Sequence, residues 1–103
     1  MFIVSVPLGF YVRPSKATTI IVPDDYLTIQ AAIAAASDGD TVFVRSGTYL
    51  ENVEVSKSLN LIGENAETTT INGESYAALV VNGNSCQVAG FTFTSPDFIL
   101  PTS

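Results

Sequence analysis

The acidic side chains are the first candidates for chemistry, because carboxylates perform acid–base catalysis and bind cations. Asp38 and Asp40 flank Gly39, but two carboxylates fall short of the roughly six to eight oxygens that calcium takes. A turn is therefore the preferred interpretation of this segment. Glu51 and Glu54 lie three positions apart, so on an extended chain they point to opposite faces and cannot act as a catalytic pair. We expect both to be solvated.

The other residue types that usually carry catalysis are scarce. The chain has no histidine, which excludes Ser-His-Asp and Cys-His mechanisms and removes a common metal ligand. Cys86 is the single cysteine, so it can form neither an intramolecular disulfide nor a thiolate metal site, and we expect a small core residue. The sequence therefore predicts no catalytic residue, no cofactor site and no metal site.

Three tyrosines are the candidate binding residues, since an aromatic ring offers sugars a flat apolar platform with a polar edge. They are Tyr26, Tyr49 and Tyr76. Each neighbours a turn, where tyrosine also commonly fills a corner. Sugar stacking and corner filling both remain open from the sequence.

The element that precedes most of these residues is a short helix. Apolar residues recur at helical spacing and form one narrow stripe, consisting of Ile29, Ala32, Ile33 and Ala36, which predicts about three turns. The candidate N-caps before the stripe are Asp24, Asp25 and Thr28. The segment from Ser37 to Asp40 ends the helix, with Gly39 able to adopt the left-handed conformation.

After the helix the period changes to short β-rich runs. A first strand is expected before the helix, over Thr19 to Val22, and later strands over 41–44, 52–55 and 59–62, separated at 46–48, 56–58 and 63–65. The separators lack the two-residue turns of hairpins. The pattern of 53–63 returns about 26 residues later in 79–93, which is the size of a solenoid repeat.

The run from Thr28 to Gly73, TIQAAIAAASDGDTVFVRSGTYLENVEVSKSLNLIGENAETTTING, resembles the N-terminal portion of right-handed parallel β-helix proteins of the pectin-lyase-like superfamily. It is most similar to the carbohydrate-binding and sugar-hydrolase type of surface β-helix, and it is also similar to the opening of pectin methylesterases. The resemblance extends roughly over Thr19 to Ser95. It implies an all-β solenoid, a single-stranded right-handed parallel β-helix of about two coils, capped at its N-terminal end by the short α-helix.

The resemblance also implies what the chain lacks. The catalytic aspartates, glutamines and arginine of pectin methylesterases, and the calcium-binding aspartates of pectate lyases, belong to later coils. Our first hypothesis is a non-catalytic β-helix module of an exported surface protein, carbohydrate-associated or structural. The second is the N-terminal fragment of a polysaccharide-active enzyme, a carbohydrate esterase or lyase. The third, a maturation protein for a metal centre, is disfavoured because histidine and paired cysteines are absent.

The charge composition limits which classes of partner the protein can bind. Ten acidic residues oppose four basic ones, for a net charge of −6, which argues against a nucleic-acid partner because phosphate contacts need clustered Lys and Arg. A polysaccharide is the expected partner. Solenoids usually need about three repeats, so either residues 98–100 fold back over the open C-terminal end of the solenoid, or we expect self-association through that end or instability.

Three segments are expected. Residues 1–17 are read as a truncated export signal or as a hydrophobic N-terminal flap, and their apolar run is too short to span a membrane. Residues 18–95 form the cap and the first coils, and residues 96–103 form an irregular tail. Export would place the protein outside the cell or at its surface, where the resembling proteins occur.

Overall fold

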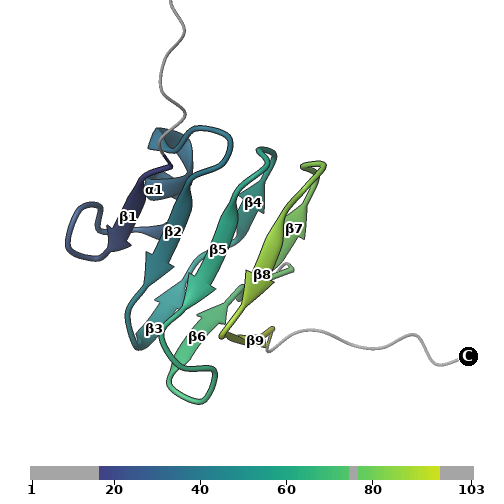
Figure 1. The fold of residues 1–103 in the computed structure, drawn as a ribbon. Coiled ribbons are helices and arrows are strands. Elements are labelled where there is room, and N and C mark those ends of the chain that lie inside the picture. Colours follow the sequence, from purple (N-terminus) through teal and green to yellow (C-terminus); the bar gives the residue numbers. More distant parts are fainter. Residues whose placement is uncertain (1–16, 75–76, 96–103) are drawn as a thin grey trace, which may run out of the picture.

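The computed structural model describes residues 17–74 and 77–95. Within them the chain forms one helix and a series of short strands (Figure 1). In chain order these are β1 (Thr19–Val22), α1 (Ile29–Ala35), β2 (Thr41–Val44), β3 (Gly47–Leu50), β4 (Val53–Val55), β5 (Asn60–Gly63), β6 (Thr69–Asn72), β7 (Leu79–Val81), β8 (Gln87–Ala89) and β9 (Thr92–Thr94).

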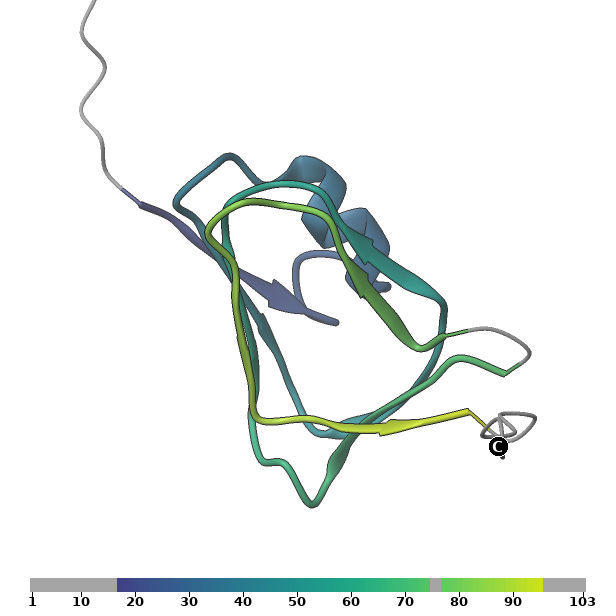
Figure 2. The same cartoon turned by 90° about the vertical axis from the view of Figure 1, so that its right-hand side faces the viewer.

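The strands stack into three sheets in which every pairing is parallel. One sheet has the order β1-β2-β5-β8, the second β3-β6-β9 and the third β4-β7. Viewed along the axis in Figure 2, the chain passes from one sheet to the next and winds as a right-handed coil. The right-handed parallel β-helix is therefore confirmed. It has about three turns rather than two, since β8 and β9 begin a third turn after two complete ones.

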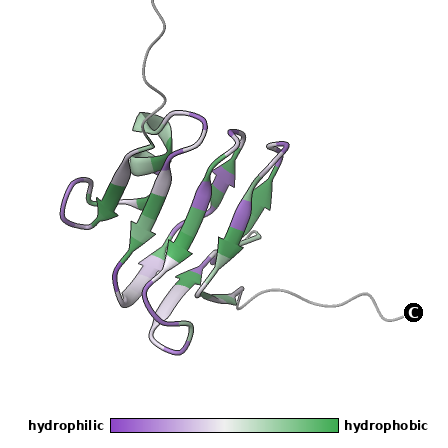
Figure 3. Cartoon of the chain, viewed as in Figure 1, coloured by the Kyte–Doolittle hydropathy of each residue, from purple (hydrophilic) through white to green (hydrophobic). Residues whose placement is uncertain are grey.

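The register confirms the repeat that the sequence indicates. Val53 pairs with Leu79 and Leu61 with Val88, so apolar residues stack directly over apolar residues from turn to turn. The strands that contribute these pairs alternate between buried and outward-facing positions. Figure 3 shows the consequence, with hydrophobic residues concentrated in the strands and hydrophilic residues in the connecting turns.

The core fills the first two turns and thins toward the third. Inward residues of β2, β4 and β5 are almost completely buried: Val42, Val44, Val53, Val55 and Leu61. Farther along the chain, Leu79, Val88 and Phe91 are only half-buried, while Val81 and Phe93 are 43% exposed. They belong to the last turns described, and no further turn covers them within residues 17–74 and 77–95.

Helix α1 covers the other end of the solenoid, as expected. It contacts β1, β2 and β4 and buries Ile29, Ala32 and Ile33. It is shorter than the three turns expected, because Ala36 already has extended backbone angles. Thr28 is the N-cap, with its hydroxyl accepting from the Ala31 N–H at 3.1 Å. Gly39, at φ +93°, follows in the left-handed region.

Two strands, β3 and β6, were not predicted. The sequence places a separator at Ser46, Gly47 and Thr48, whereas Gly47–Leu50 forms β3 and pairs with β6. A glycine next to threonine is typical of a turn, yet here Gly47 begins a strand that makes up one whole side of the coil. Strand β6, which begins with Thr69 and Thr70, was likewise not recognised as a strand from the sequence.

The interpretations of residues 1–17 as an export signal or flap and of 96–103 as an irregular tail fall outside the described residues, apart from position 17. In the part of the chain that is described, no helix has the length and apolar character needed to cross a membrane.

Candidate functional site

The acidic turn after α1 is held by backbone donors. The Asp40 carboxylate accepts from the N–H of Thr18 at 3.0 Å and from that of Ser37 at 2.9 Å, and Asp38 accepts from the Ser58 N–H at 3.1 Å. These hydrogen bonds favour the charged form, so the N–H groups of Ser37 and Thr18 lower the pKa of Asp40. Across residues 17–74 and 77–95, His, Cys, Asp and Glu form no group of three that could hold a metal ion.

The sequence predicts that Glu51 is solvated, and this prediction is wrong. In the structure its carboxylate binds the start of α1. Its two carboxylate oxygens accept from the N–H groups of Ile29, at 2.8 Å, and Gln30, at 3.0 Å. A carboxylate at this position satisfies amide groups that have no partner within the helix and complements the helix dipole. The contact arises because the coil brings Glu51 beneath residues more than 20 positions earlier, which sequence spacing does not reveal.

Lys57 binds the other end of the same helix. Its ammonium donates to the carbonyl oxygens of Ile33, Ala34 and Ala36, at 2.9, 2.9 and 2.6 Å.

The side chain of Gln30, in the first turn of α1, pairs with the backbone of β4. Its Oε1 accepts from the Glu54 N–H, and its Nε2 donates to the Glu54 carbonyl. Gln30 thus occupies the edge of β4 much as a neighbouring strand would.

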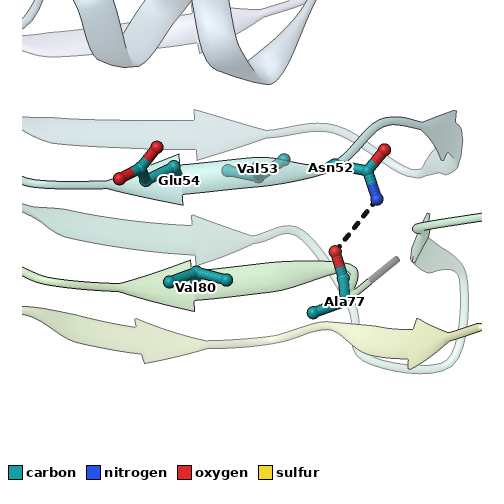
Figure 4. Close-up of a pocket in the computed structure, with 5 residues that line it drawn as sticks. All are labelled: Asn52, Val53, Glu54, Ala77 and Val80. Atoms are coloured by element: carbon teal, nitrogen blue, oxygen red, sulfur yellow. Dashed lines mark hydrogen bonds between the residues drawn. The ribbon is translucent and has the colours of Figure 1, made fainter. Parts of the chain in front are cut away.

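The outer side of the β4-β7 sheet carries a shallow depression of about 340 Å³. Five residues line it, and Figure 4 shows them: Asn52, Val53, Glu54, Ala77 and Val80. Val80 is 45% exposed and gives the depression an apolar floor. Glu54 stands directly beside Val80, because the two are register partners.

Hydrogen bonds fix the polar rim of this depression. The Asn52 amide nitrogen donates to the carbonyls of Gly73, at 2.6 Å, and Ala77, at 3.0 Å. One carboxylate oxygen of Glu54 accepts from the Asn82 amide at 2.8 Å. An apolar floor with a few fixed polar groups is the usual composition of a small-molecule binding site. Sequence reasoning missed it, although the 26-residue repeat that aligns Glu54 with Val80 was visible.

A second groove, of about 400 Å³, lies at the last described turn and is lined by Ala78, Leu79, Phe93, Thr94 and Ser95. Its walls include Leu79 of β7 and Phe93 of β9, which point toward the axis of the coil. The groove is therefore the cross-section of the solenoid rather than a feature of its outer surface.

The candidate tyrosines differ in their surroundings. Tyr26 lies between β1 and α1 and is 38% exposed. Tyr49 lies on β3, packs against the core and donates its hydroxyl to the Arg45 carbonyl at 2.8 Å. Burial raises the pKa of Tyr49. Tyr76 lies outside the described residues.

The two basic side chains in the described ranges are both engaged. Arg45 forms an ion pair with Asp24 at 2.9 Å, and this hydrogen bond lowers the pKa of Asp24. Lys57 is held by the carbonyls at the end of α1. Cys86 is half-buried against the core and donates its thiol hydrogen to the Lys57 carbonyl.

Comparison with known proteins agrees with the fold. A 56-residue segment is 41% identical to pectinesterase 1 of Solanum lycopersicum, covering 48% of this chain and 10% of that protein. The chain thus spans about a tenth of the length of the relative it matches. No family model matches the chain, and no solved structure matches it.

The topology and this similarity together define the class. The chain is a right-handed parallel β-helix with an N-terminal capping helix, and it resembles the pectin-lyase-like superfamily, within which a pectinesterase shares a segment with it.

Proposed function

We propose that the chain is a carbohydrate-associated, non-catalytic β-helix module of an exported surface protein, and that the depression on the β4-β7 sheet contacts the glycan. The observation that carries this proposal is the similarity of a 56-residue segment to a pectinesterase, combined with a parallel solenoid whose outer side holds a depression with an apolar floor and a polar rim. Sugar rings also combine an apolar face with a polar edge, so such a depression suits them.

The proposal is tested by affinity electrophoresis, which measures binding of the full chain to a panel of soluble polysaccharides. Val80→Asn removes part of the apolar floor at an exposed position. Covering half of a valine contributes about 1 kcal/mol, so binding should weaken roughly fivefold. Leu50→Asn is the matched control, because Leu50 is 60% exposed and lies on another sheet. Equal binding by both variants and the unchanged chain would show that the depression is not the contact site.

Export and the remaining partner predictions need their own measurements. Export is tested by expressing the full chain with an epitope tag and comparing the culture medium and cell surface with the cell interior. Self-association through the last turn is tested by light scattering on a size-exclusion column. Stacking of sugar on Tyr26 is tested by Tyr26→Ala in the same binding assay.

A second candidate function follows from the small part of the pectinesterase that the matching segment covers. Because the match reaches only 10% of the pectinesterase, the chain also fits the N-terminal part of a polysaccharide-active enzyme whose active site lies on other coils. A longer reading frame that encodes further coils, with release of methanol from methyl-esterified pectin by its product, would favour this function over a non-catalytic module.

A further inference from the structure

The polar rim of the depression on the β4-β7 sheet presents hydrogen-bond acceptors. Both hydrogens of the Asn52 amide are already donated, to the carbonyls of Gly73 and Ala77. Figure 4 shows the Asn52 oxygen turned away from Ala77, and no hydrogen bond to it occurs among residues 17–74 and 77–95. The side-chain oxygen of Asn52 is therefore available to accept.

Glu54 has the same character. Its backbone N–H and carbonyl are both paired with the Gln30 side chain, and one carboxylate oxygen accepts from Asn82. The second carboxylate oxygen has no donor among the described residues. Asn52 and Glu54 are two positions apart on an extended segment, so their Cα atoms lie roughly 7 Å apart and their side chains share a face. A ligand that satisfies both must supply at least two hydrogen-bond donors.

No cation in the described ranges balances the Glu54 charge. Arg45 is paired with Asp24, and the three protons of Lys57 are donated to carbonyls of α1. The whole chain carries a net charge of −6. A carboxylate on the ligand would therefore meet Glu54 as an uncompensated like charge.

We propose that this depression selects an uncharged, hydroxyl-rich glycan and rejects a polyuronate. The inference rests on the proposed function and defines its ligand class. Sugar hydroxyls can donate to Asn52 and Glu54 while the apolar face of the ring covers Val80. A uronate keeps its hydroxyl donors, but its carboxylate brings a like charge next to Glu54 and has no proton to give.

The experiment measures binding of the full chain to three soluble probes: a neutral galactan, polygalacturonate, and the same polyuronate with its carboxyl groups methyl-esterified. The galactan and the ester should bind, and polygalacturonate should bind about tenfold more weakly at low salt, because like charges within a few ångströms repel. Added salt should narrow that difference.

Glu54→Gln separates the local charge from the charge of the whole chain. It should raise the ratio of polygalacturonate binding to galactan binding severalfold, because the repelled charge is gone, while any loss of an acceptor oxygen weakens both probes alike. Glu67→Gln makes the same charge change at an exposed loop position, where the Glu67 side chain has no hydrogen bond to any described residue, and it should leave that ratio unchanged. Equal gains in the two variants would overturn the role of Glu54.

The remaining outcomes distinguish this inference from the proposed function. If polygalacturonate binds as tightly as its methyl ester, the selection for uncharged glycans is wrong while carbohydrate binding stands. If none of the three probes binds, the proposed function and this inference both fail.

Discussion

Replacing Lys57 with methionine tests whether the capping helix is held mainly by one ammonium group. Methionine keeps most of the aliphatic volume of lysine and removes the three hydrogen bonds to the carbonyls of Ile33, Ala34 and Ala36. These carbonyls end α1 and have few other donors, because the last carbonyls of a helix have no partner within it.

The size of the effect follows from the number and kind of these bonds. A hydrogen bond that involves a charged group contributes about 1.5–3 kcal/mol net, and the favourable interaction with the helix dipole adds about 0.3–1 kcal/mol. The three bonds share one half-buried ammonium, so their contributions do not add fully. We expect a loss of about 2–3 kcal/mol, which for a domain of this size lowers Tm by about 10–20 °C.

The assay is urea denaturation of the full chain followed by far-UV circular dichroism, with Arg45→Met as the matched control. Arg45 and Asp24 form an ion pair whose side chains are 45% and 47% exposed, and such pairs contribute at most about 1 kcal/mol. If Lys57→Met costs no more than Arg45→Met, the three short hydrogen bonds add no net stability and the account of the cap is wrong.

Three further predictions use the same denaturation assay. The pKa of Asp40 is lowered below its ordinary 3.8, so its contribution to stability is present above pH 3.8 and is lost as pH falls through the folded pKa. In the unchanged chain the urea concentration at the denaturation midpoint should fall with pH below about pH 4, and Asp40→Asn should make this fall less steep. An equally steep fall in the variant would contradict the prediction. Gly63→Ala should cost more than about 2 kcal/mol, because the new Cβ would overlap the Gly90 carbonyl on the next turn; a change below about 0.5 kcal/mol would show that the turns separate easily. Gln30→Ala should cost about 1 kcal/mol, since it removes both hydrogen bonds to the Glu54 backbone, and a neutral result would mean that water replaces them fully.

The solenoid was predictable because its strongest signal is carried by residues that repeat. Val53 over Leu79 and Leu61 over Val88 stack like on like, so the register of a parallel coil leaves a period in the sequence. The capping helix was predictable for a similar local reason, with an apolar stripe after Thr28. Strand β3 was not, because Gly47 and Thr48 are turn residues by type and only their pairing with Thr69 and Thr70 makes them extended.

The depression could not be predicted to the same degree. Its floor and rim come from β4, β7 and the corner before β7, and the residues that meet there are separated by more than 20 positions in the chain. The sequence predicts that Glu51 and Glu54 are solvated, because their partners are distant in the chain. Gln30 comes near Glu51, and Asn82 near Glu54, only when the coils stack. Side-chain partners across coils depend on the corner geometry, which the strand period does not specify.

The cap and the proposed ligand selectivity have one physical origin. The chain is acidic, and the described part uses its two cations inside the fold: Lys57 closes the end of α1, and Arg45 pairs with Asp24. A cation committed to backbone carbonyls cannot also bind a uronate without releasing the helix. Selecting an uncharged glycan at Glu54 is therefore compatible with a stable first turn, whereas binding a polyuronate through Lys57 would have to compete with the interaction that keeps the end of the solenoid covered.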